Sequence, residues 1–205
     1  MSVTGFWIVG AITSAAVQRL RGLFPPPPVE TAEDLALWQA MDEATIAEPE
    51  LAYNRPYLPT DVVLRFLEMT GARTPEADAD IETCIKAVAE VEDEDRFVAS
   101  IRKGDPVAAL FYGLGFTAAR TLPGRFGCFL LTGDEVVAAL PAARAILTMD
   151  ASRRAQVLAR IYAWLEVAGD ESTDFDAGGL VDGVPRILLR AAELGRGAVG
   201  VVQWY

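Results

Sequence analysis

The side chains best suited to chemistry are carboxylates, and they are concentrated in two segments of the first half of the chain. Seven acids and no lysine or arginine lie between Val29 and Asn54, and nine acids with the single Lys86 lie between Glu76 and Asp95. The net charge of the 205 residues is −11. Such a field repels nucleic acid phosphates and anionic lipid, and it attracts basic proteins.

We therefore expect a basic protein partner and neither a nucleic acid nor a membrane. The candidate partner-binding residues are the acids that crowd the ends of the two segments: Asp42, Glu43, Glu48, Glu50, Glu90, Glu92, Asp93, Glu94 and Asp95. The alternative is a solvated helix face, since runs of charge usually serve solubility.

The composition removes several kinds of catalysis. The chain contains no histidine, so neither a histidine-based triad nor a histidine-bound zinc can form within it. The two cysteines, Cys84 and Cys128, are far apart without paired spacing, which favours reduced, buried thiols over a metal site or a disulfide framework. We accordingly assign no catalytic residue, no metal and no cofactor.

A weaker pattern suggests a small-molecule site. Tyr112, Arg120 and Arg125 lie near the glycines of residues 113–127 and could line an anion pocket. The glycines match neither GxxxxGK[ST] nor GxGxxG, and are better explained as turns. These residues support the alternative function, a small-molecule-binding domain or an enzyme that uses carboxylate, tyrosine and arginine side chains.

The loop at residues 169–179 alternates acids in the manner of a calcium loop. Counted from Asp170, however, the sixth position holds Phe175 and not glycine, and the twelfth holds Val181 and not glutamate. A solvated loop explains the composition better, because Asp, Ser and Gly are common loop formers.

The elements that must position these residues follow from local signals. At 5–22 the arginines come after the apolar run and the run is interrupted, which disfavours a signal peptide or a spanning helix. The pattern of residues 5–22 instead predicts a strand, a helix cap at Thr13 or Ser14, and a helix. At 127–140 a second strand leads into a helix whose start, Thr132 and Glu135, has capping-box spacing.

The remaining chain is mostly helical in pattern. We expect helices from Thr31, over 57–71, from about Asp80 to Lys103 (continuous or broken near the acidic residues 92–95), from Ser152 to Gly169 and around 186–194. A spacer is expected at the four prolines of 25–28 and a strand at 198–205. The prediction is an α+β fold: one mostly helical domain over residues 1–205 with a small sheet of about three strands.

In its order of motifs the chain resembles the YfbM-like family, domain of unknown function 1877. The matching pieces are GFWIVGAITSAAVQRL, ALFYGLGF, RFGCFLLTGDEVVAAL, DFDAGGL and AELGRGAVGVVQWY. One departure is Phe111, where members often carry a histidine. The resemblance implies an α+β fold and a bacterial, cytoplasmic setting, but no defined activity. The function we predict is a non-enzymatic acidic interaction protein, such as an immunity or inhibitor protein.

Overall fold

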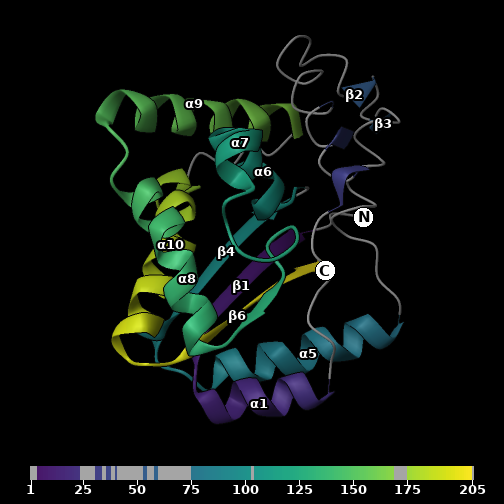
Figure 1. Ribbon diagram of the computed structural model, residues 1–205. Coiled ribbons are helices and arrows are strands. Elements are labelled where there is room, and N and C mark those ends of the chain that lie inside the picture. Colours follow the sequence, from purple (N-terminus) through teal and green to yellow (C-terminus); the bar gives the residue numbers. More distant parts are fainter. Residues whose placement is uncertain are drawn as a thin grey trace.

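A four-stranded antiparallel sheet, in the order β4-β1-β6-β5, organises the computed structural model (Figure 1). The model describes residues 4–23, 31–33, 36–37, 40, 53–54, 58–59, 75–102, 104–168 and 175–204. The strands are β1 (Thr4–Ile12), β4 (Arg96–Arg102), β5 (Phe129–Leu131) and β6 (Gly197–Trp204), and a separate pair joins β2 (Tyr53–Asn54) to β3 (Leu58–Pro59).

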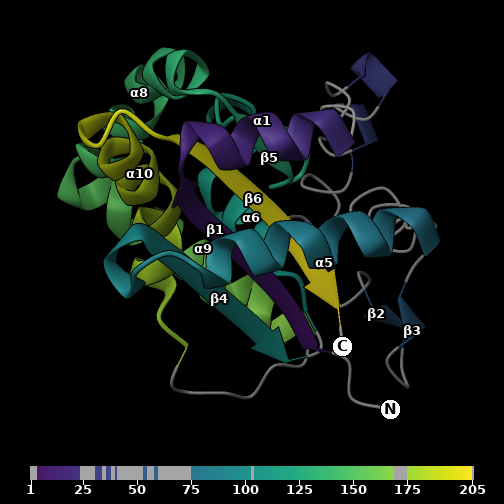
Figure 2. The same cartoon turned by 90° about the horizontal axis from the view of Figure 1, so that it is seen from below.

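Helices lie on both faces of this sheet. Their bounds are α1 (Ser14–Leu23), α5 (Pro75–Ala89), α6 (Pro106–Leu114), α7 (Phe116–Ala119), α8 (Gly133–Leu147), α9 (Ala151–Ala168) and α10 (Ala177–Glu193), with a 3-10 turn η1 at Asp93–Asp95. Helices α1 and α5 cover one face, and α6, α8, α9 and α10 gather on the other (Figures 1 and 2). The predicted α+β class is confirmed, and the sheet has four strands where we expected three.

Alternation along the central strands divides the core in two. Trp7 and Val9 of β1, with Val202 of β6, pack into the larger cluster with α6, α8, α9 and α10. Val199 and Val201 of β6 belong to the smaller cluster with α1 and α5. Because side chains alternate between the faces of a strand, both central strands are apolar on both sides and are covered on both.

The first helix on the larger side, α6, is buried along its whole length. At its start, Asp105 accepts a hydrogen bond from the Val107 amide at 2.8 Å, and Pro106 occupies the first turn, where no amide partner is needed. At its end, Arg160 donates to the Tyr112 carbonyl oxygen at 2.8 and 2.6 Å, and Arg153 donates to that of Leu114 at 2.5 Å. These arginines, both from α9, satisfy carbonyls that have no partner within the helix.

The prediction of a helix from Asp80 to Lys103 is wrong for residues 96–102, which form a strand. The helix α5 ends at Ala89, the acidic run forms the turn η1, and residues 96–102 form β4, which pairs with β1 from Gly10↔Arg96 to Thr4↔Arg102. In β4, Ala99 and Ile101 are buried while Val98 and Ser100 are exposed. That period of two is the pattern of a strand, but pairing with a segment some ninety residues away decides it.

Several of the other predicted helices and strands are present in the structure. The strand and helix at 5–22 are confirmed as β1 and α1, with the Ala16 amide donating to the Thr13 hydroxyl at 3.2 Å. The long helix after Ser152 and the terminal strand are confirmed as α9 and β6. The last helix begins earlier than expected, at Ala177. The four prolines, most of the helix from Thr31 and most of 57–71 lie outside the described residues.

The capping box is confirmed at the start of α8. The Glu135 amide donates to the Thr132 hydroxyl at 3.4 Å, and the Thr132 amide donates to the Glu135 carboxylate at 2.7 Å. Arg21 of α1 pairs with the same carboxylate and donates to the Leu130 carbonyl. Hydrogen bonds from Arg21 and then from the Thr132 amide lower the pKa of Glu135 to about 2. One carboxylate therefore joins α1 to the start of α8.

We predict that Thr132→Ala lowers the free energy of unfolding by about 1 kcal/mol, because the Glu135 amide loses its acceptor. The midpoint of urea unfolding measures this. Thr117→Ala removes a hydroxyl from an exposed position in α7 and should change stability by less than about 0.5 kcal/mol. Equal effects of the two substitutions would contradict a capping role for Thr132.

Candidate functional site

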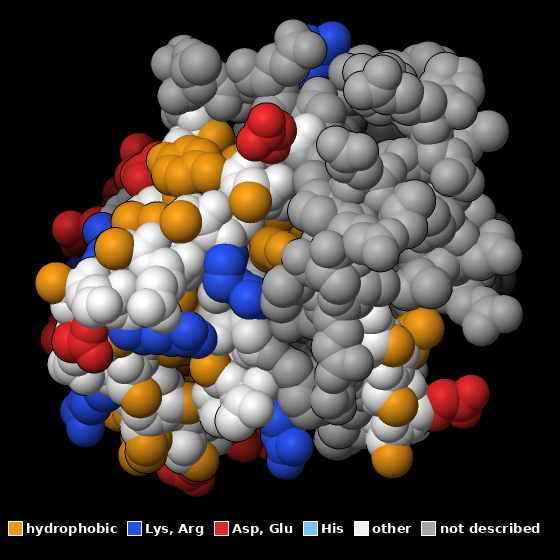
Figure 3. Space-filling view, turned by 90° about the horizontal axis from the view of Figure 1, so that it is seen from above, with side chains coloured by type: hydrophobic (Ala, Val, Ile, Leu, Met, Phe, Trp, Pro, Cys, Tyr) orange, Lys and Arg blue, Asp and Glu red, His pale blue; other side chains and the backbone are white. Residues whose placement is uncertain are grey.

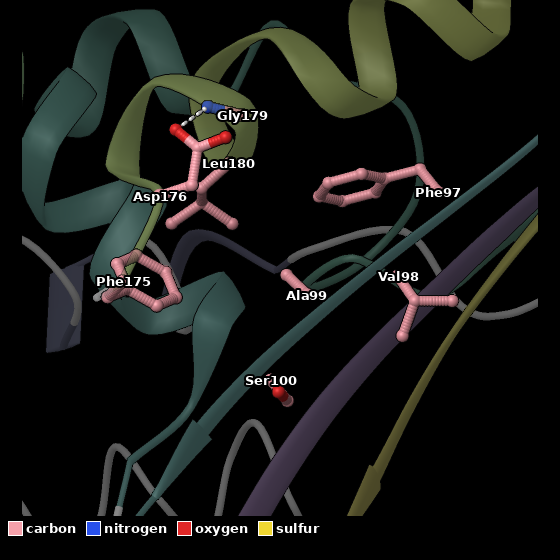
Figure 4. Close-up of a pocket in the computed structure, with 8 residues that line it drawn as sticks. All are labelled: Phe97, Val98, Ala99, Ser100, Phe175, Asp176, Gly179 and Leu180. Atoms are coloured by element: carbon pink, nitrogen blue, oxygen red, sulfur yellow. Dashed lines mark hydrogen bonds between the residues drawn. The ribbon is translucent and has the colours of Figure 1, made fainter. Parts of the chain in front are cut away.

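A groove between β4 and α10 is the candidate site, and it contains two cavities. The larger, about 350 Å³, is lined from β4 by Phe97, Val98, Ala99 and Ser100 and from the start of α10 by Phe175, Asp176, Gly179 and Leu180 (Figure 4). The smaller, about 210 Å³, is lined by Asp93, Glu94, Arg96, Phe97, Gly183, Arg186 and Ile187. Phe97 lines both, so the two cavities are neighbours between β4 and α10, and together they are called the groove.

Phe97 reaches α10 because the helix has a glycine opposite it. A Cβ atom built on Gly183 would lie 2.3 Å from the Phe97 ring, so only glycine permits this contact. The other side of the ring meets Trp7 edge to face, with centroids 6.0 Å apart. The ring is therefore held between the sheet and the helix.

Ion pairs hold α10 near both of its ends. Arg154 of α9 forms two hydrogen bonds of 2.8 Å with Asp182, and Asp176 caps the helix by accepting from the Gly179 amide at 2.7 Å. Toward the other end, Arg190 donates to Asp95 and Glu94, both at 2.8 Å. The bidentate pair fixes the orientation of α10 relative to α9, and the contacts of Arg190 hold α10 beside the turn that leads into β4.

The predicted acidic face is partly present at one end of the groove. Glu90, Glu92, Asp93 and Glu94 are exposed, and the last two line the smaller cavity. Asp93 pairs with Arg96, yet its side chain remains 88% exposed, and that of Glu94 remains 71% exposed. The other predicted acids, Asp42, Glu43, Glu48 and Glu50, lie outside the described residues.

Asp95 differs from its neighbours, and the expectation that it belongs to an exposed face is wrong. The residue is 3% exposed, and its two oxygens accept hydrogen bonds from Arg190 at 2.8 Å and from Arg196 at 2.6 Å. The hydrogen bond from Arg190, followed by that from Arg196, lowers the pKa of Asp95 although burial opposes the shift. Both arginines are about a hundred residues further along the chain, so no local pattern shows this burial.

The residues of the expected anion pocket do not line this groove. Tyr112 is buried in α6, with the Arg160 guanidinium 4.7 Å from its ring centroid. Arg120 is exposed after α7, and Arg125 forms a backbone bridge with Cys128 and lies over the Phe126 ring. Neither cavity includes any of the three.

Other chemistry finds little support in the part of the chain that is described. No three acids or cysteines there are grouped to hold a metal ion. Cys84 and Cys128 are free thiols, and burial raises the pKa of Cys84 to about 11, so this thiol stays protonated. Of the acids in the loop 169–179, Asp176 alone is described, and it caps α10.

The face seen from above carries both signs of charge (Figure 3). Seen from above, blue Lys and Arg side chains and red Asp and Glu side chains both occur on the described surface (Figure 3). Among the described helices, none has the length and apolar character needed to cross a membrane.

Comparison with known proteins adds no assignment: no protein-family model, curated protein or solved structure matches this chain. The resemblance to the YfbM-like family therefore stays a prediction. Phe97, Ser100 and Leu180, which line the groove, were not among the predicted site residues. The alternation of apolar and polar residues in RFVASIR was a local signal for the strand β4. No local signal indicated that α10 would pack against this strand.

We predict that Asp95→Asn lowers the free energy of unfolding by about 1.5–3 kcal/mol at neutral pH, because two charged hydrogen bonds weaken at a buried position. The folded pKa of Asp95 is lowered, so its contribution is full above the ordinary value of 3.8 and is lost as pH falls through the folded value. The difference between wild type and variant, measured by urea unfolding, should therefore shrink in acid. Glu94→Gln, at an exposed carboxylate, should cost under about 1 kcal/mol and serves as control.

We also predict that Gly183→Ala displaces the Phe97 ring and destabilises the fold by about 1–3 kcal/mol, as overpacking does. Thermal unfolding and the NMR shift of the Trp7 indole N–H measure the two effects. Gly22→Ala, in α1, meets no atom within 4 Å and should leave both unchanged or slightly raise stability. An unmoved Trp7 signal in Gly183→Ala would show that the ring does not depend on this glycine.

Proposed function

We propose that this chain is a non-enzymatic interaction protein that binds a basic surface of a protein partner, as an immunity or inhibitor protein does. The supporting observation is the exposed acidic cluster of Glu90, Glu92, Asp93 and Glu94 beside the groove. The bacterial, cytoplasmic setting implied by the resemblance to the YfbM-like family is part of this proposal.

The ion pairs around this cluster explain why its charge faces outward. Arg190 and Arg196 both pair with the buried Asp95. Arg190 also touches Glu94, but that carboxylate stays largely in solvent. Exposed pairs contribute little to stability, so Glu94 can exchange Arg190 for a partner's cation at small cost.

The net charge extends the effect beyond contact distance. At −11, the protein attracts a cationic partner over roughly the Debye length of 8–10 Å at moderate salt. Such attraction raises association rates more than it strengthens the final complex. We therefore assign the acidic cluster mainly a role in fast encounter.

The test compares two triple variants with the same change in charge. The first neutralises Glu92, Asp93 and Glu94 to their amides, and the second neutralises Glu82, Asp134 and Glu166, which are exposed elsewhere. The partner is obtained by photo-crosslinking from position 92 in cells that produce the protein, and is then purified. Association rates are measured against ionic strength for wild type and both variants.

We expect the first variant to associate at least about threefold more slowly at low salt and to show a flatter salt dependence. The second variant should stay closer to wild type, because its charges lie away from the cluster. Identical rates and slopes for the two variants would reduce the acidic cluster to a solvated surface and remove the basis of the proposal.

A further inference from the structure

The larger cavity lies along the edge of a strand. Four consecutive residues of β4, from Phe97 to Ser100, line it. Side chains of consecutive strand residues point to opposite faces. Phe97 and Val98 do project from opposite sides of β4 in Figure 4. Because one cavity touches all four, it must lie beside the strand, where the backbone N–H and C=O groups are.

Within the described part of the chain, that edge has no neighbouring strand. Strand β4 is at the end of the sheet order and pairs with β1 over its whole length of seven residues. Figure 2 shows it as the outermost strand on its side of the sheet. In an antiparallel pair, every second residue turns its N–H and C=O away from the partner strand, so part of the β4 backbone faces the groove.

The edge also lacks the features that usually prevent strand pairing. Natural edges carry prolines, bulges or charges, or are very short. Strand β4 has charged residues only at its ends, Arg96 and Arg102, and presents Val98 at 54% exposure between them. By contrast, β5 at the other end of the sheet has three residues.

The opposite wall suits the side chains of an added strand. Phe175 and Leu180 are apolar, and Gly179 leaves that part of α10 without a side chain. With Phe97, these residues can receive alternate apolar side chains, while the backbone pairs with β4. Backbone pairing then supplies affinity, and the side chains that line the cavity supply selectivity, as in other cases of strand addition.

We propose that an extended, basic segment of a partner protein binds in this groove by adding a strand to the free edge of β4. The basic character rests on the proposed function, and the binding mode does not. Asp176 lines the larger cavity, which has no lysine or arginine among its described lining residues, and can meet a cation of the segment. At the smaller cavity Asp93 pairs with Arg96 and Glu94 pairs with Arg190, so a second cation of the segment would replace one of these exposed pairs. A second copy of this chain is disfavoured as occupant, because two charges of −11 repel.

The probe is a fluorescent peptide, Lys-Val-Thr-Val-Thr-Val-Lys, with apolar residues at alternate positions and cations at its ends. Two modified forms carry backbone N-methyl groups, one on the valines and the other on the threonines. In an extended chain, the N–H groups of valines and threonines point to opposite edges. Strand addition uses one edge, so only one modified form should lose binding.

We expect the unmodified peptide to bind, and one methylated form to bind at least about tenfold more weakly, since it loses several backbone hydrogen bonds. The other form should stay within about threefold. Fluorescence anisotropy measures binding, and hydrogen exchange should show new protection of alternate amides in residues 97–101 when the peptide is bound.

A pair of protein variants tests the same edge independently. Val98→Pro and Ala99→Pro remove neighbouring N–H groups, one directed at β1 and the other at the groove. Proline is tolerated on an edge strand where the N–H of the replaced residue makes no hydrogen bond within the sheet. The variant that keeps its thermal stability is therefore the one that has lost an N–H directed at the groove. That variant should lose peptide binding.

Three results would overturn the proposed binding mode. The first is equal binding of the two methylated peptides. The second is no binding of the unmodified peptide at concentrations up to about 1 mM. The third is concentration-dependent dimers of the protein that protect the β4 amides without peptide. The proposed function fails separately, when neutralising Glu92, Asp93 and Glu94 leaves partner association unchanged.

Discussion

The rest of the structure depends on the complete burial of α6. A helix without exposed residues cannot give its terminal amides and carbonyls to water, so protein groups must satisfy them. Asp105 does so at the start, and Arg153 and Arg160 of α9 do so at the end. These contacts fix α9 over α6. Since Arg154 of the same helix binds Asp182, the position of α10 follows from the same constraint.

The groove results from how α10 is held against β4. Arg154 fixes it near its start and Arg190 fixes it near its end, while Gly183 and Phe97 meet between these points. The helix therefore lies close to the sheet at the middle of the groove and leaves a cavity on either side. The buried Asp95 serves this arrangement, whereas its neighbours Asp93 and Glu94 keep most of their side chains in solvent although each pairs with an arginine. One short acidic run thus has a structural part and a surface part.

Much of the local structure could be predicted from the sequence. The cap at Thr13, the capping box of Thr132 and Glu135, and the helix α9 are encoded within a few residues, and all were predicted. The strand β4 was assigned to a helix, because the pattern of the adjacent helix was extended into its seven residues despite their period of two. Asp95 was assigned to the surface for a related reason: its partners, Arg190 and Arg196, follow 95 and 101 residues later.

What the sequence by itself determined is therefore local or summed over the chain: the capped helices, the apolar strands β1 and β6, the net charge of −11 and the lack of histidine. The tertiary structure alone decided which acid is buried, which strand forms the edge of the sheet, and that Phe97 and Leu180 share a cavity. The physical reason is that capping and periodicity act over a few residues. The groove and the Asp95 pairs instead join segments that approach each other only when the sheet and helices pack.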